Sequence, residues 1–160
     1  MSVASKLLVA LVAFVAMEPI SYATHRWVMH GIGMRWHRSH HIPSGGGWEA
    51  NDIFPVLFSS IGVATFGTAA LGGPSWLFWA GGGITAYGLT YLFVHEVYIH
   101  RRLRSPLDEV AYLDWLRESH RIHHLFGTEP YGMLLPLVPR RLRLRAATRR
   151  PITASTRSRL

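Results

Sequence analysis

The sequence has no cysteine and little charge. The absence of cysteine from its 160 residues excludes disulfides, thiolate nucleophiles, cysteine-type zinc sites and protein-bound iron–sulfur clusters. Charged residues make up 16% of the chain, whereas an average soluble protein has about 25%. Hydrophobic residues make up 49% and are concentrated in long blocks. A chain of this length predicts one domain, and this composition favours a membrane protein.

Acidic residues are also scarce. Nine Asp and Glu stand against 17 Lys and Arg, which gives a net charge of +8. Nucleic-acid binding is not expected, because no aromatic-rich basic domain or zinc-finger spacing accompanies this charge. No G-x-G-x-x-G motif follows a strand, so a bound nicotinamide or flavin is not expected either. We expect a membrane domain over residues 1–139 and an arginine-rich, flexible tail over residues 140–160, which would lie near anionic lipid headgroups or, as the alternative, bind an acidic redox partner.

Three apolar segments predict membrane-spanning helices. Residues 53–71 and 76–94 carry no charge and are long enough to cross a bilayer. Residues 7–23 are interrupted by Glu18 and Pro19, and a cleaved signal peptide is the alternative for this segment. We therefore expect an all-α integral membrane bundle of about three to four spans.

The two uncharged segments are joined by a short Gly-Gly-Pro-Ser turn at residues 72–75. They predict a transmembrane hairpin whose outer ends lie on the same side of the bilayer. Arginines gather on that side and are missing from the turn, which makes the side cytoplasmic by the positive-inside rule. We expect a membrane protein with its functional site on the cytoplasmic face.

Every histidine of the chain falls into one of four short clusters on that side. The order is a five-spaced pair, an H-x-x-H-H triplet, a long apolar gap, a second pair and a second triplet. Neutral imidazole is the commonest nitrogen ligand for transition metals, and ten clustered imidazoles are enough for two ions. We expect a histidine-rich di-metal cap whose candidate ligands are His25, His30, His37, His40, His41, His95, His100, His120, His123 and His124.

On an α-helix, the histidines of a triplet and those of a pair point in different ways. Residues at i, i+3 and i+4 share a helix face, so the members of each triplet converge. The second triplet lies on an amphipathic helix predicted over residues 108–124, and Pro43 ends any helix that carries the first. Five-spaced residues diverge by about 140° on an α-helix. The two histidines of a pair either serve different metals or flank a distortion of the helix.

Carboxylates are few near these clusters, and no Glu-x-x-His motif of soluble di-iron bundles occurs. Glu96 is a candidate outer ligand that accepts a hydrogen bond from an imidazole. Glu18 is an intramembrane carboxylate and therefore a candidate for the same role, with contact to an arginine or a polar cavity as the alternative. Asn51 and Asp52 are expected to cap the second span.

Several of these motifs resemble those of bacterial β-carotene 3-hydroxylases, which belong to the wider fatty acid hydroxylase and sterol desaturase group of membrane non-haem di-iron enzymes. The resemblance covers about residues 15–135 and rests on order, spacing and flanking residues. Its segments are H-R-W-V-M-H-G at 25–31, W-H-R-S-H-H at 36–41, E-A-N-D at 49–52, T-A-Y-G at 85–88, the pair at 95 and 100, and H-R-I-H-H at 120–124.

The resemblance implies an O2-dependent hydroxylation of the β-ionone rings at C3 and C3′, which converts β-carotene through β-cryptoxanthin to zeaxanthin. It implies two iron ions held by the ten histidines and electrons from reduced ferredoxin. Aromatic residues of the apolar segments are candidates to line a slot for the polyene, with lipid-facing or interfacial placement as the alternative, and they are Phe54, Phe58, Trp79, Tyr87 and Tyr91. The alternatives are a di-iron hydroxylase or desaturase of another membrane lipid, and a membrane metal-binding or transport protein.

Overall fold

The structure is a computed structural model, and it describes residues 1–42, 48–102, 107 and 110–149. The proline that follows the first triplet and the predicted helix start at residue 108 lie outside the described residues. Within them the chain is all-helical, with six α-helices and no strand. The predicted all-α class is therefore confirmed.

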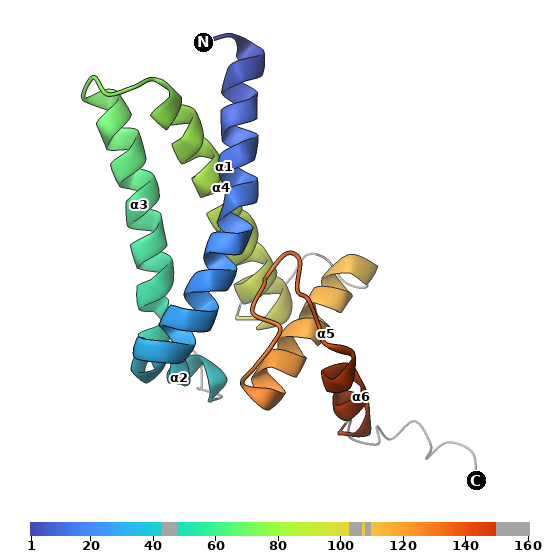
Figure 1. Ribbon diagram of the computed structural model, residues 1–160. Coiled ribbons are helices and arrows are strands. Elements are labelled where there is room, and N and C mark those ends of the chain that lie inside the picture. The colour runs from blue at the N-terminus through green and yellow to red at the C-terminus, as the bar shows by residue number, and fades with distance from the viewer. Residues whose placement is uncertain (43–47, 103–106, 108–109, 150–160) are drawn as a thin grey trace.

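Three long apolar helices form the body of the molecule (Figure 1). They are α1 (Val3–Ala23), α3 (Ile53–Ala70) and α4 (Trp76–Leu92), and a tight turn joins α3 to α4. With their helical extensions, three segments of the described chain are long and apolar enough to cross a membrane, Val3–Ile32, Ala50–Ala70 and Trp76–Ile99. The protein is a membrane protein, and the predicted spans and hairpin match these helices closely.

Helix α4 lies between its two partners and packs against both α1 and α3. Glycine makes the first of these contacts close, because a Cβ atom on Gly83 would lie 2.1 Å from the carbonyl oxygen of Ala10. The same Cβ would lie 2.9 Å from the methyl group of Ala13. Small residues allow helix backbones to approach closely in membranes, and here they let α1 pack closely against α4.

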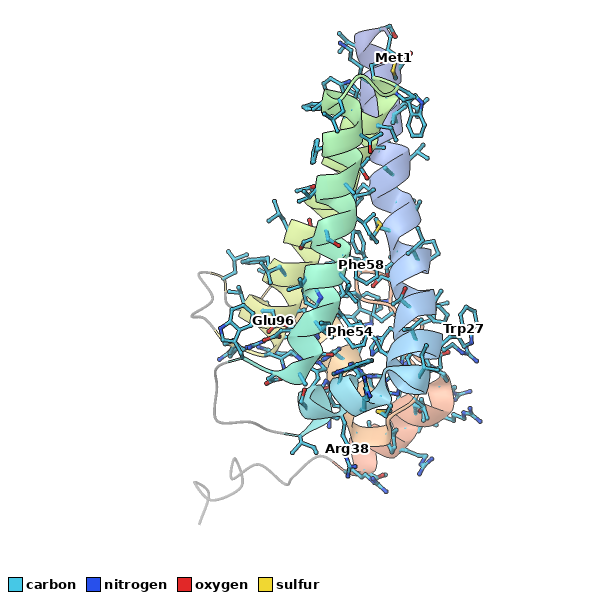
Figure 2. The ribbon with its side chains drawn as sticks, turned by 90° about the vertical axis from the view of Figure 1, so that its left-hand side faces the viewer. Met1, Trp27, Arg38, Phe54, Phe58 and Glu96 are labelled. Carbon is cyan, nitrogen blue, oxygen red and sulfur yellow. The ribbon has the colours of Figure 1, made fainter. Side chains whose placement is uncertain are left out.

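A cap of shorter helices covers the end of the bundle opposite the hairpin turn (Figures 1 and 2). It contains α2 (Met34–His41), α5 (Ala111–Phe126) and α6 (Arg140–Thr148). Helix α5 ends at Gly127, whose φ of 62° is the left-handed conformation that glycine adopts most easily at a helix end. The first and second histidine triplets lie on α2 and α5, as their spacing predicts.

The arginine-rich tail differs from expectation, because residues 140–148 form α6 instead of a flexible extension. Leu142 and Ala146 are four residues apart and therefore share one helix face. Both are buried against Ile122 of α5, with Phe126 and Val138 around them. Two apolar positions at helical spacing are enough to seat a short helix even when its other face carries arginines. Residues 150–160 of the predicted tail lie outside the described residues.

Candidate metal centre

Both five-spaced histidine pairs lie at π-helical segments that extend the membrane helices, although His100 is the first residue after its segment. Thr24–Ile32 continues α1, with a kink at Gly31, and Phe93–Ile99 continues α4. A π-helix is wider than an α-helix and its hydrogen bonds join residues five apart, as the backbone bond from His100 N to His95 O does at 2.9 Å. Residues five apart therefore share a face. The pairs were predicted either to serve different metals or to flank a distortion of the helix, and the structure shows the distortion.

The first histidine group brings together the first pair, part of the first triplet and one residue of the second triplet. One ring nitrogen from each of four residues lies within 4.8 Å of the others, and these residues are His25, His30, His37 and His123. His41 adjoins the group, with its Nε2 atom 3.1 Å from that of His37. This group is called cluster 1 below, with His41 as its fifth member.

The second histidine group brings together the second pair, part of the second triplet and one residue of the first triplet. Its four residues with ring nitrogens within 4.8 Å of one another are His40, His95, His100 and His120. His124 is its fifth member, with Nε2 3.1 Å from that of His40. This is cluster 2. Each cluster thus takes a whole pair and two members of the triplet from one half of the chain, and one histidine from the other half, which is His123 in cluster 1 and His40 in cluster 2.

The spacing between ring nitrogens matches the edges of a metal coordination shell. The Nε2 atom of His40 lies 3.1 Å from that of His95 and 3.4 Å from that of His120, and the His100 and His120 Nε2 atoms are 3.0 Å apart. At a metal–nitrogen distance of about 2.1 Å, neighbouring ligands lie about 3.0 Å apart in an octahedron and about 3.4 Å apart in a tetrahedron. The residues therefore fit a bound metal ion.

Hydrogen bonds on the outer side of three rings support this fit. Nδ1–H of His25 donates to the Tyr131 carbonyl at 3.0 Å, and Nδ1–H of His37 donates to Asn51 Oδ1 at 2.7 Å. Each ring then carries its proton on Nδ1, yet their Nε2 atoms face each other at 3.2 Å. Two lone pairs at this distance repel unless a cation lies between them. His123 is fixed in the same way by the Thr128 carbonyl at 2.6 Å.

Four histidines of the cap are held in the neutral form at physiological pH, which is the form that binds metal. Burial, together with neighbouring imidazoles, lowers the pKa of His41 and of His100 to about 4. The same causes lower the pKa of His124 to about 3 and the pKa of His120 well below its usual range. No proton has to be displaced at neutral pH before these nitrogens can coordinate.

Glu96 contacts an imidazole as predicted, and the ring is that of its neighbour His95. Its Oε1 atom accepts from His95 Nδ1 at 2.6 Å, and its Oε2 atom accepts from Arg102 at 2.9 Å. Arg102 also donates to both carboxylate oxygens of Asp52, at 3.0 and 3.2 Å. This chain of contacts ties the end of α4 to the start of α3 and orients the His95 ring.

Glu18 lies elsewhere. Its carboxylate accepts the hydroxyl of Tyr87 at 2.7 Å and the backbone N–H groups of residues 133–135. These described partners include no arginine and no imidazole. Glu18 therefore holds the connection between α5 and α6, and reaches the histidines only through it: Thr128 and Tyr131 of that connection accept from His123 and His25.

An apolar cavity of about 380 Å³ leads from the membrane-spanning helices to the histidines. It runs along α3 from Phe54 to Phe66, which is about 18 Å at 1.5 Å per residue. Four of the five aromatic residues proposed for a slot line it, and Trp79 does not. At its inner end the cavity meets members of both clusters, namely His25, His37, His40 and His95.

A second, polar cavity of about 500 Å³ lies on another side of the centre. It is lined by His100, His120 and His124 together with charged residues of α5, which include Arg117 and Glu118. The histidines therefore meet an apolar space on one side and a polar space on another.

Apart from Glu96, the outer partners of the rings were not predicted from the sequence. Asn51 was expected to cap a helix, but it is buried and accepts from His37. An asparagine two residues before an apolar span is equally compatible with capping the helix and with accepting a hydrogen bond from a histidine, so the sequence does not distinguish the two roles. The carbonyls of Thr128 and Tyr131 belong to backbone, so no residue type could have indicated them.

Comparison with known proteins agrees with the site. The sequence profile of the fatty acid hydroxylase family matches residues 10–142. A β-carotene hydroxylase of Pseudescherichia vulneris is 41% identical over 119 residues, which are 73% of this chain and 66% of that protein. One of Paracoccus sp. (strain PC1) is 34% identical over 122 residues, 75% of each chain.

A chloroplastic β-carotene 3-hydroxylase of an Oncidium hybrid cultivar is 39% identical over 127 residues, which are 76% of this chain and 42% of the plant protein. No solved structure shows a significant match. The matched residues contain both histidine clusters, helices α3 and α4, and most of α1. The chain belongs to the fatty acid hydroxylase family, together with the bacterial β-carotene hydroxylases.

Proposed function

We propose that the protein is a β-carotene 3-hydroxylase. It inserts oxygen at C3 and C3′ of the β-ionone rings and converts β-carotene through β-cryptoxanthin to zeaxanthin. The observation that carries the proposal is the apolar cavity that begins between the membrane helices and ends at the histidine clusters. The names of the similar proteins supply the substrate class.

The ten histidines are the proposed ligands of two iron ions, with five in each cluster. Bound iron supplies the redox chemistry that activates O2 and attacks an unactivated C–H bond. The chain supplies neutral imidazoles in fixed orientations, because Asn51, Glu96 and the carbonyls of Thr128 and Tyr131 hold the outer nitrogens. Such outer contacts set ring orientation and ligand basicity.

The substrate reaches the centre from the lipid. Gly62, Val63 and Ile84 line the cavity within the apolar helices, so a carotenoid dissolved in the bilayer can enter without crossing water. Phe54 and Tyr91 lie near the inner end, where they keep water from the ring that reacts. A ring at this end lies beside imidazoles of both clusters, and the polyene extends along α3.

Electrons come from a separate donor, for which we propose ferredoxin. The polar cavity beside His100, His120 and His124 opens the centre to the aqueous side, away from the apolar cavity. Arginines of the cap make this the cytoplasmic side of the bacterial inner membrane by the positive-inside rule. A soluble donor and a lipid-dissolved substrate then approach the centre from different phases.

The proposal is tested by expressing the chain in a bacterial host that accumulates β-carotene. We expect β-cryptoxanthin and zeaxanthin by liquid chromatography, and two irons per purified chain. His40→Ala and His123→Ala should lose iron and product, whereas Ser60→Ala, which changes an exposed hydroxyl on α3, should retain both. An iron-loaded protein that leaves β-carotene unchanged, or full activity in both histidine variants, would refute the proposal.

A further inference from the structure

The connection between α5 and α6 is apolar and rises beside α4 toward the hairpin turn before it returns to α6 (Figure 1). Its sequence from residue 134 to 138 is Leu-Leu-Pro-Leu-Val. Leu135 and Leu137 are 66% and 79% exposed, while Met133 is buried against Val94 and Leu116. One side of this segment, called the leucine loop below, therefore packs on the helices and the other side is uncovered.

The leucine loop is attached to the bundle at the level of the membrane-spanning helices. Glu18 accepts the backbone N–H groups of Met133, Leu134 and Leu135 at 3.0, 3.0 and 2.9 Å. Glu18 is five residues before the end of α1 and Tyr87, its other partner, is five before the end of α4. At 1.5 Å per residue, the attachment lies about 8 Å inside both helices.

Several polar backbone groups of the loop are paired within the protein. Glu18 satisfies three consecutive donors, Pro136 has no N–H to satisfy, and the Leu134 carbonyl accepts from the hydroxyl of Tyr112. Non-helical backbone is tolerated at membrane depth only where protein groups satisfy it in this way. An apolar surface loop in water would need no buried carboxylate for its amides, since water would serve them.

Aromatic side chains mark the boundary next to the loop. Tyr112 and Trp115 at the start of α5 are 48% and 41% exposed, with their ring centroids 5.6 Å apart. In the π-helical segment that continues α1, Trp27 points outward at the level of Phe54 and Glu96 (Figure 2). Exposed Trp and Tyr side chains are typical of the headgroup region of a bilayer. Glu18 is nine residues from Trp27, on the side of the hydrocarbon core.

We propose that the leucine loop is a re-entrant segment whose exposed leucines contact lipid acyl chains, with Glu18 as its anchor within the membrane. The loop and the aromatic start of α5 then form one continuous membrane-contacting surface with α1 and α4. The partner of this surface is the lipid of the bilayer itself. The loop thereby holds the histidine-bearing helix α5 against the membrane.

Spin labelling tests this directly, because the chain has no cysteine and a single introduced cysteine gives a unique label. Leu135→Cys and Leu137→Cys are labelled in the full chain in phosphatidylcholine vesicles, and collisions with O2 and with a water-soluble nickel chelate are measured. Val15→Cys on α1 and Leu144→Cys on α6, 58% and 59% exposed, are the lipid and water controls. We expect both loop positions to match Val15, with an O2-to-nickel ratio several-fold above that of Leu144.

Two results would overturn the proposal. Nickel accessibility equal to that at Leu144 would place the loop in water. Exclusion of both reagents with dipolar broadening would show that a second copy of the chain covers it. Glu18→Ala in the Leu137→Cys background provides a second measurement: loss of the anchor should shift the label toward nickel accessibility, whereas an unchanged ratio would refute the role of Glu18.

Discussion

At the scale of single residues, the outer nitrogen of each imidazole decides what the inner nitrogen can bind. A neutral ring has one proton, and an acceptor on the outer side draws that proton away from the metal side. Four rings have such an acceptor, supplied by two side chains, Asn51 and Glu96, and two backbone carbonyls. The acceptors come from four places in the chain, so ring orientation depends on the cap as a whole.

Asn51 offers the cleanest test of this dependence. Asn51→Ala removes the acceptor of His37 Nδ1 and frees the ring to rotate or to carry its proton on Nε2. We expect iron affinity at cluster 1 to fall about 10–100-fold, the usual effect of losing an outer partner. Competition with an iron chelator measures this, and at limiting iron the stoichiometry should fall from two per chain toward one.

Asn51→Asp is the matched control, since it keeps an oxygen acceptor at the same position. It should retain most of the affinity. If the alanine variant bound two irons as tightly as the unaltered protein, Asn51 would not orient a ligand and the bond to His37 would be incidental to the centre.

At the scale of helices, the five-residue step between paired histidines shows where sequence reasoning succeeds and where it stops. Uncharged runs and a Gly-Pro turn predict α3 and α4 nearly to their ends, because hydrophobic length in a membrane leaves few choices. The triplets likewise predict helix faces. A five-residue spacing, however, is compatible with divergence on an α-helix or with convergence on a π-helix.

Tertiary contacts decide between these local forms, which is why the sequence left them open. The pair at 95 and 100 and the pair at 25 and 30 converge only because the two membrane helices widen at the same level, next to α5. The ten histidines divide into two clusters of five, and each cluster contains one histidine from the other half of the chain. This division also depends on how α2 and α5 face each other. No local pattern contains that information.

Helix α6 gives a prediction at this scale, because it replaces an expected tail. Leu142→Ala removes a side chain that is 5% exposed and packs on Ile122, at a cost of about 2–3 kcal/mol in local stability. Trypsin should then cleave within residues 140–149 roughly 30-fold faster, since cleavage follows the population of the open form. Mass spectrometry of the fragments measures the rate.

Leu144→Ala serves as the comparison, because this leucine is 59% exposed on the same helix. Its cleavage rate should stay close to that of the unaltered protein. Equal, fast cleavage in all three proteins would instead favour the flexible tail that the arginine content predicts.

At the scale of the whole molecule, the fold places the proposed metal centre between the apolar helices and the cap. The apolar cavity reaches it through the membrane helices and the polar cavity reaches it through the cap. Close packing at Gly83 brings α1 onto α4, while the side of α4 that faces α3 keeps room for a ligand. Glycines of α4 therefore have two separate roles, and these roles can be distinguished by substitution.

Gly88 and Gly82 make that distinction. An added Cβ would meet no heavy atom within 4 Å at either position, so both Gly88→Leu and Gly82→Leu should fold and bind iron. Only Gly88 lines the apolar cavity, and a leucine there occupies the space proposed for the polyene. We expect Gly88→Leu to lower kcat/KM for β-carotene by about 10-fold or more, which corresponds to 1.4 kcal/mol or more of lost transition-state binding. Gly82→Leu should stay near the unaltered value.

Product formation in vesicles, normalised to iron content, measures the activity of both variants. If the two variants were equally active, the carotenoid would not pass Gly88, and the cavity along α3 would have to be abandoned as its path.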